Sequence, residues 1–175
     1  MTSVAIFKWA MNPHDERVGS DGQIKWLAER PEAGDDDYAA VQVARDAAPD
    51  AELVGLTMAS GDMAFAAARG AERTVALEGV SILAQPTEVA SSLAYAVKAM
   101  GDVSIVSIGD AAWSPMVPSL LAAELGWPCI LAVDAVRPEG DTLVVTRRFG
   151  PGRPGGRSAP RGGAEARYEA GPAGA

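Results

Sequence analysis

Two short stretches of the sequence carry residue types that could hold a flat, hydrogen-bonding ligand. Lys8-Trp9-Ala10 follows one strand-like segment, and Gly109-Asp-Ala-Ala-Trp-Ser-Pro115 follows another. Small residues allow close approach to the backbone, hydroxyl and amide groups can donate hydrogen bonds, and Trp faces can stack on a ring. The alternative role for Trp9 and Trp113 is packing against neighbouring helices, which is more common for a Trp in such a loop.

Other polar candidates favour structural roles. Asp35 to Asp37 open a predicted helix, where side-chain oxygens cap free amides, and a divalent-cation site would need a second carboxylate cluster. His14 lies in a polar loop without a nucleophile motif nearby, which favours a solvated side chain over a catalytic base. Cys129 falls inside a predicted strand and is interpreted as a small buried hydrophobe. One Cys and one His cannot build a conventional zinc site.

The sequence contains no recognisable catalytic signature. The one GxGxxG match, residues 150–155, includes two prolines and opens no helix, so it is interpreted as compositional. A Walker A motif, a nucleophile elbow and a pair of catalytic carboxylates are all missing. The residues alone therefore do not predict an enzyme.

Alternating strand-like and helix-like segments predict the scaffold that positions the two loops. The clearest helix has Pro86 in its first turn, apolar residues at helical spacing, and Gly101 at its end. The pattern predicts an α/β fold: a doubly wound, mostly parallel sheet of about five strands with helices on both faces and an antiparallel edge strand. Predicted strands cover residues 3–9, 52–58, 74–77, 103–108 and 129–133, predicted helices cover 38–48, 61–70, 86–100 and 116–125, and the edge strand covers 142–148.

This scaffold predicts where a ligand binds. In an open parallel sheet, ligands lie outside the carboxyl ends of the strands where the strand order reverses, which points to the loops after the first and fourth strands. The connection over residues 11–32 is long for a simple strand-to-helix loop, which suggests a functional role. Its turn pair Asp21-Gly22, beside Ile24 and Trp26, predicts a small hairpin.

Composition narrows the class of protein. A chain of 175 residues with 48% hydrophobic residues can bury the core of one domain. Its net charge of −8 argues against a nucleic-acid partner, because phosphate backbones are bound through clustered Lys and Arg. A single Cys is typical of a reducing compartment, and no apolar run approaches the roughly 20 residues that span a bilayer. A cytoplasmic protein that neither spans a membrane nor is exported is expected.

The last 25 residues differ from the rest. Residues 151–175 contain 7 Gly and 4 Pro and are predicted to be disordered. Their 4 Arg and 2 Glu give a charge of +2. Because the whole chain carries −8, the first 150 residues carry −10. We expect one folded domain over residues 1–149, followed by a disordered Gly/Pro/Arg-rich tail over 150–175.

The order of several segments resembles the β subunit of an electron-transfer flavoprotein, near the nitrogen-fixation and carnitine-reduction branch. These segments are VAIFKW, GDDDYAAVQVAR, AELVGLTM, AAARGAERTVAL and LGWPCI. The resemblance covers about residues 3 to 149 and implies an adenine-nucleotide-hydrolase-like domain. Family members usually continue well past this point, so the tail is interpreted as a truncated or frame-shifted C-terminus.

The resemblance implies a heterodimer with an α subunit that shares FAD. The β subunit binds AMP or a second FAD, and electrons pass from a flavin dehydrogenase to a quinone-linked or ferredoxin-type acceptor. It also implies an electron carrier rather than a catalyst on its own. Carried over by position, the cofactor-binding residues are Lys8, Trp9, Ala10, Met58, Ala59, Ser60, Gly61, Gly109, Asp110, Ala111, Ala112, Trp113 and Ser114.

The loop after the fourth strand departs from the family pattern. This chain has Gly-Asp-Ala-Ala-Trp-Ser-Pro there, where family members commonly have an Asp- or Gln-containing phosphate loop. Two alternatives therefore stay open. The chain could be a stand-alone adenine-nucleotide-binding module of the universal-stress-protein type, or a truncated, inactive remnant.

Overall fold

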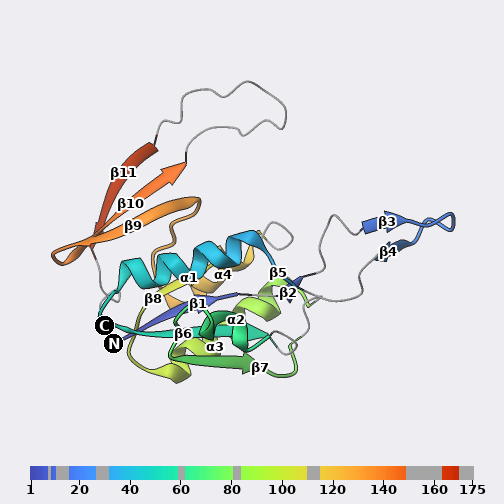
Figure 1. Ribbon diagram of the computed structural model, residues 1–175, viewed down its shortest axis with the longest axis horizontal. Coiled ribbons are helices and arrows are strands. Elements are labelled where there is room, and N and C mark those ends of the chain that lie inside the picture. Colours follow the sequence, from blue (N-terminus) through green and yellow to red (C-terminus); the bar gives the residue numbers. More distant parts are fainter. Residues whose placement is uncertain are drawn as a thin grey trace.

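The computed structural model describes residues 1–7, 9–10, 16–26, 32–58, 62–80, 84–109, 115–148 and 163–169 (Figure 1). Its centre is a four-stranded parallel sheet of β1 (Thr2–Ile6), β6 (Glu52–Met58), β7 (Arg73–Leu77) and β8 (Val103–Ile108). The strand order is β7-β6-β1-β8, and each neighbouring pair runs parallel. This order places β1 between the second strand of the sheet and the last.

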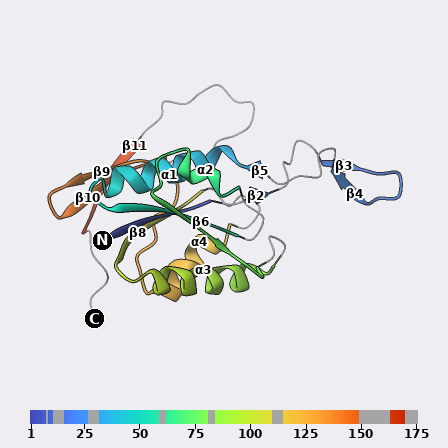
Figure 2. The same ribbon diagram turned by 60° about the horizontal axis from the view of Figure 1, so that its bottom comes forward.

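Helices cover both faces of this sheet, which confirms the predicted doubly wound α/β class. α1 (Asp35–Ala47) and α2 (Ala64–Ala67) lie on one face, and α3 (Pro86–Met100) and α4 (Val117–Leu125) lie on the other (Figure 2). α3 begins at Pro86 and ends at Gly101, whose φ of 87° suits a residue without Cβ. α3 is the longest helix in the described ranges, and none of those helices is long and apolar enough to cross a membrane.

The core follows from the alternation of side chains along β1 and β6. Val4 and Ile6 pack with α3 and α4, whereas Ala5 and Phe7 point to the opposite face and pack with α1 and α2. All four side chains are buried. Strands buried on both faces have the near-continuous apolar sequence seen here, as expected for the inside of a parallel sheet.

The predicted fifth parallel strand over residues 129–133 is wrong. Ala132 has a φ of 58°, which interrupts an extended chain, and the next strand, β9 (Val133–Glu139), joins a different sheet. Cys129, predicted to be buried in that strand, is exposed. The error arose because the apolar run Cys129–Val133 follows a helix, where the alternation predicts a strand.

A second, antiparallel sheet contains the end of the described chain. β10 (Thr142–Arg148) lies between β9 and β11 (Gly163–Glu169), and Gly140, with a φ of 63°, turns the chain between β9 and β10. The antiparallel pairing predicted for 142–148 is therefore confirmed, but β10 is the middle strand of a separate sheet and not the edge strand that was predicted. The predicted disorder is wrong for residues 163–169, since these residues pair with β10 along its whole length. Composition hid this strand because Gly and Pro around it dominate the segment.

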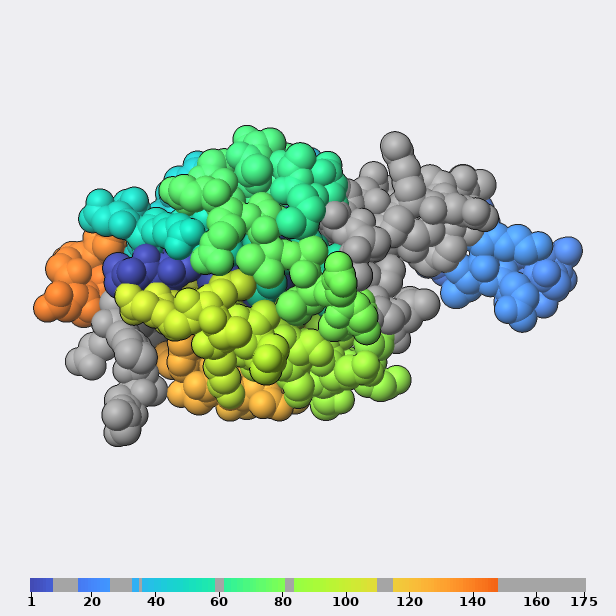
Figure 3. Space-filling model, turned by 90° about the horizontal axis from the view of Figure 1, so that it is seen from below, coloured from blue at the N-terminus to red at the C-terminus, as the bar shows by residue number. Residues whose placement is uncertain are grey.

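The predicted hairpin is confirmed as β3 (Glu16–Val18) and β4 (Ile24–Trp26), which pair antiparallel around Gly22. It extends away from the sheet at one end of the molecule (Figure 1 and Figure 3). Two further short strands, β2 (Trp9–Ala10) and β5 (Glu32–Ala33), pair antiparallel between β1 and α1 in the chain.

Candidate nucleotide-binding crevice

The strand order reverses between β1 and β8. From β1 the chain moves outward through β6 to β7, and then returns to the other side of β1 as β8. Ile6 is the register partner of Ile108, and the Gly109 backbone N–H donates to the Ile6 carbonyl oxygen at 3.4 Å. The segments that leave these two strands therefore start side by side, as the topology of a ligand-binding crevice requires.

The N-terminus of α1 lies against the end of β8 at this reversal point. Gly109 is buried, and a Cβ added to it would lie 2.5 Å from Asp37 Oδ1, 3.0 Å from the Asp37 backbone N and 3.1 Å from the Asp36 carbonyl carbon. A Cβ at position 109 would therefore force the Asp37 side chain and the first turn of α1 to shift. The glycine therefore lets the first turn of α1 rest directly on the end of β8.

The first turn of α1 is already occupied by carboxylates. Asp37 is 6% exposed, and its Oδ2 accepts a hydrogen bond from the Gly34 N–H at 2.9 Å. The capping role predicted for the aspartates is thus confirmed at Asp37. Because Asp36 and Asp37 place negative charge at the positive end of the helix dipole, this terminus is unfavourable for a phosphate group.

The N-terminus of α4 lacks the negative charge found at the start of α1. α4 follows β8 on the other face of the sheet, begins at Val117 and has no acidic residue in its first turn. Its Pro118 lacks an N–H and suits the first turn, where amides have no partner inside the helix. Of the two helices that flank the reversal point, α4 is therefore the one whose N-terminal charge is compatible with an anion.

Comparison with family models matches the electron transfer flavoprotein domain over residues 31–152. The chain belongs to this family. Proteins of the electron transfer flavoprotein family are generally flavoproteins that work with a partner subunit and with dehydrogenases. A comparison with curated proteins finds no match.

In this electron transfer flavoprotein domain, the predicted site residues fall into four groups. Gly109 lies at the crevice, as described above. Met58 is 4% exposed and its side chain packs in the core with α3, so only its backbone can belong to a ligand loop. Trp9 and Ala10 form β2, which pairs with β5. Lys8, Ala59, Ser60, Gly61, Asp110, Ala111, Ala112, Trp113, Ser114 and His14 lie outside the described residues.

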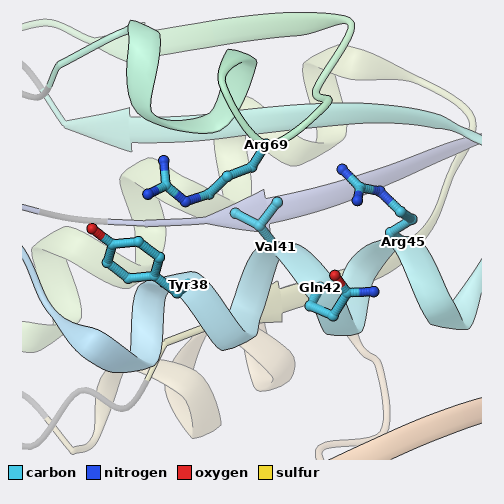
Figure 4. A pocket seen from close by; sticks show the side chains of 5 residues that line it. All are labelled: Tyr38, Val41, Gln42, Arg45 and Arg69. Atoms are coloured by element: carbon cyan, nitrogen blue, oxygen red, sulfur yellow. The ribbon is translucent and has the colours of Figure 1, made fainter.

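The sequence did not lead us to predict a cluster of side chains on the face of α1 that lies beside α2. Tyr38, Val41, Gln42 and Arg45 line a groove together with Arg69, which follows α2 (Figure 4). Their spacing of three and four residues places the four α1 residues on one helix face, and this signal was available in the sequence. The sequence could not predict that Arg69 joins these residues, because its position depends on how α2 packs beside α1.

Proposed function

We propose that this chain is the β subunit of an electron transfer flavoprotein, of the nitrogen-fixation and carnitine-reduction branch. With an α subunit it carries electrons from a flavin dehydrogenase to a quinone-linked or ferredoxin-type acceptor, in the cytoplasm. Residues 1–149 supply the binding domain, and the β site takes AMP or a second FAD. The observation that carries this proposal is the reversal of strand order between β1 and β8 in a chain of this family.

The charges at the two helix N-termini beside the reversal point favour one orientation of the proposed adenine nucleotide. Asp37 is buried beside Gly109 and its carboxylate would repel a phosphate at the α1 end. The N-terminus of α4 lacks acidic residues, so the phosphate is expected to point there. The nucleoside then lies toward the segment that follows β1.

The loop residues supply binding and orientation in this proposal. Trp9 and Trp113 offer faces for stacking, Lys8 offers a positive charge for phosphate, and Ser60 and Ser114 offer hydroxyls. Gly61, Gly109, Ala10, Ala59, Ala111 and Ala112 allow close backbone approach, with Asp110 and the Met58 backbone completing the lining. A bound flavin supplies the redox chemistry, and the chain holds it in place and excludes water.

Co-expression with an electron transfer flavoprotein α subunit tests the proposal. We expect a stable heterodimer that is yellow and releases an adenine nucleotide on acid treatment. Trp113→Ala should lower the nucleotide content at least several-fold, whereas the matched Trp127→Ala, on the α3 and α4 face, should lower stability without selective loss of nucleotide.

Two results would contradict the proposal. Nucleotide bound by the purified chain with no complex formed would favour the stand-alone adenine-nucleotide module. A folded chain that forms no complex and releases no nucleotide would favour the inactive remnant.

A further inference from the structure

A groove of about 250 Å³ lies between α1 and the turn after α2, and Figure 4 shows the five side chains that line it. α1 contributes Tyr38, Val41, Gln42 and Arg45, and the turn after α2 contributes Arg69. Val41 is almost fully buried and closes the floor, whereas Tyr38 is 49% exposed. The groove is therefore open to solvent, unlike the enclosed pockets that bury most of a small ligand.

Arg69 is held in a defined position at one end of the groove. Its guanidinium carbon lies 4.1 Å from the centre of the Tyr38 ring and 4.0 Å from the centre of the Phe65 ring. Its Nη1 donates to the Phe65 carbonyl oxygen at 2.7 Å. Two rings and one carbonyl thus fix the guanidinium, so that it loses little conformational freedom when a ligand binds.

Arg45 is placed at the other end. A Cβ added to Gly70 would lie 2.5 Å from Arg45 Nη2, which shows that this guanidinium rests directly on the glycine backbone. In Figure 4, Val41 separates the two arginines. The groove therefore presents two positioned cations with an apolar floor between them.

Neither arginine has a carboxylate within ion-pair distance among the residues that the structure describes. Other cations there do: Lys25 pairs with Asp21, Arg73 with Glu52 and Arg137 with Glu139. On a chain with a net charge of −8, two positioned guanidinium groups without such partners form a local positive site.

We propose that this groove docks an acidic segment of a partner protein, with one carboxylate on Arg45 and a second on Arg69. Guanidinium groups bind carboxylates through paired hydrogen bonds, and within the described ranges both arginines have N–H groups that no hydrogen bond uses. Arg and Tyr are also enriched at the energetic centres of protein interfaces. None of the five groove residues is among the proposed nucleotide-binding residues, so failure of the docking proposal would leave the proposed function untouched.

Fluorescence anisotropy of the full chain tests the docking site with a defined probe, a fluorescein-labelled Gly-Glu-Leu-Glu-Gly peptide. We expect saturable binding that weakens about tenfold in Arg45→Gln, a substitution that leaves the stacked Arg69 intact. The control variant Arg137→Gln removes the same charge from β9 and should bind like the parent protein. Circular dichroism verifies that the variants are folded.

Four results of the binding measurements would overturn the proposal, and a competition experiment supplies a fifth. The four are the absence of saturable binding of the acidic peptide, equal affinity for its Gly-Gln-Leu-Gln-Gly counterpart, an equal loss of affinity in the Arg137→Gln control, and unchanged affinity in Arg45→Gln. Inorganic phosphate is added as a competitor at the same concentrations as the peptide. Complete displacement at equal concentration would assign the groove to phosphate rather than to an acidic protein segment.

Discussion

Replacing Gly109 by Ala probes the contact between β8 and α1 that shapes the candidate crevice. The added methyl group would lie 2.5 Å from Asp37 Oδ1 and within about 3 Å of backbone atoms of the first helical turn. Overpacking of this kind costs about 1–3 kcal/mol, and the loss of glycine flexibility in the unfolded chain returns about 0.4–1 kcal/mol. We expect a net loss of about 1–2 kcal/mol in the free energy of unfolding.

Urea denaturation measures this loss. With a slope of about 2 kcal/mol/M, typical of small domains, the midpoint should fall by about 0.5–1 M at unchanged slope. Gly34→Ala is the control at the same junction, because its added Cβ would meet nothing closer than Asp37 Oδ2 at 3.7 Å. Its change should stay within about 0.5 kcal/mol, since a slightly poorer cap offsets a less flexible unfolded chain. Equal midpoints for Gly109→Ala and the parent protein would refute the close packing of α1 on β8.

Two further predictions concern the core and the hairpin. Gly55→Ala should lower the urea midpoint by about as much as Gly109→Ala, because the new methyl group would overlap Ala66 on α2, and an unchanged midpoint would contradict this packing. The Asp21 carboxyl accepts a hydrogen bond from the Gln23 N–H and a second one from Lys25, and these two contacts lower its pKa below 3.8. The carboxylate therefore stabilises the hairpin fully above pH 3.8, and this stabilisation is lost as the pH falls through the lowered pKa. Carboxyl-carbon NMR should find its midpoint below 3.8 and find it closer to 3.8 in Lys25→Gln, whereas a midpoint at or above 3.8 in the parent chain would argue against these bonds.

Local patterns predicted most of the parallel sheet and its helices. The apolar runs of β1, β6 and β8 and the capped helix α3 carry strong signals of period and of turn chemistry, and each was placed within about three residues. The fifth strand was misplaced because the run Cys129–Val133 is apolar in the same way. Two features show that this run is not a fifth parallel strand: the left-handed conformation of Ala132 and the pairing of β9 with β10. Both features depend on tertiary context.

The position of the candidate site was predictable, whereas its detailed contacts were not. The topology rule selects the ends of β1 and β8 from the order of elements alone. Asp37 is buried against Gly109, which makes the α1 end unfavourable for phosphate. This contact joins two residues that are 72 positions apart in the sequence, so local patterns could not predict it. The Arg45 and Arg69 groove likewise depends on the packing of α2 beside α1.

The most direct test of the nucleotide site is amide NMR of the full chain, alone and with its α subunit, as AMP is added. If the crevice between β1 and β8 binds the nucleotide, the largest shifts should occur at Gly109 and Phe7, and at Val117 at the start of α4. The Lys98 amide, near the far end of α3, should not move. Shifts confined to the α3 and α4 surface around Thr87 and Glu124, or no shifts in either sample at millimolar AMP, would contradict the assignment.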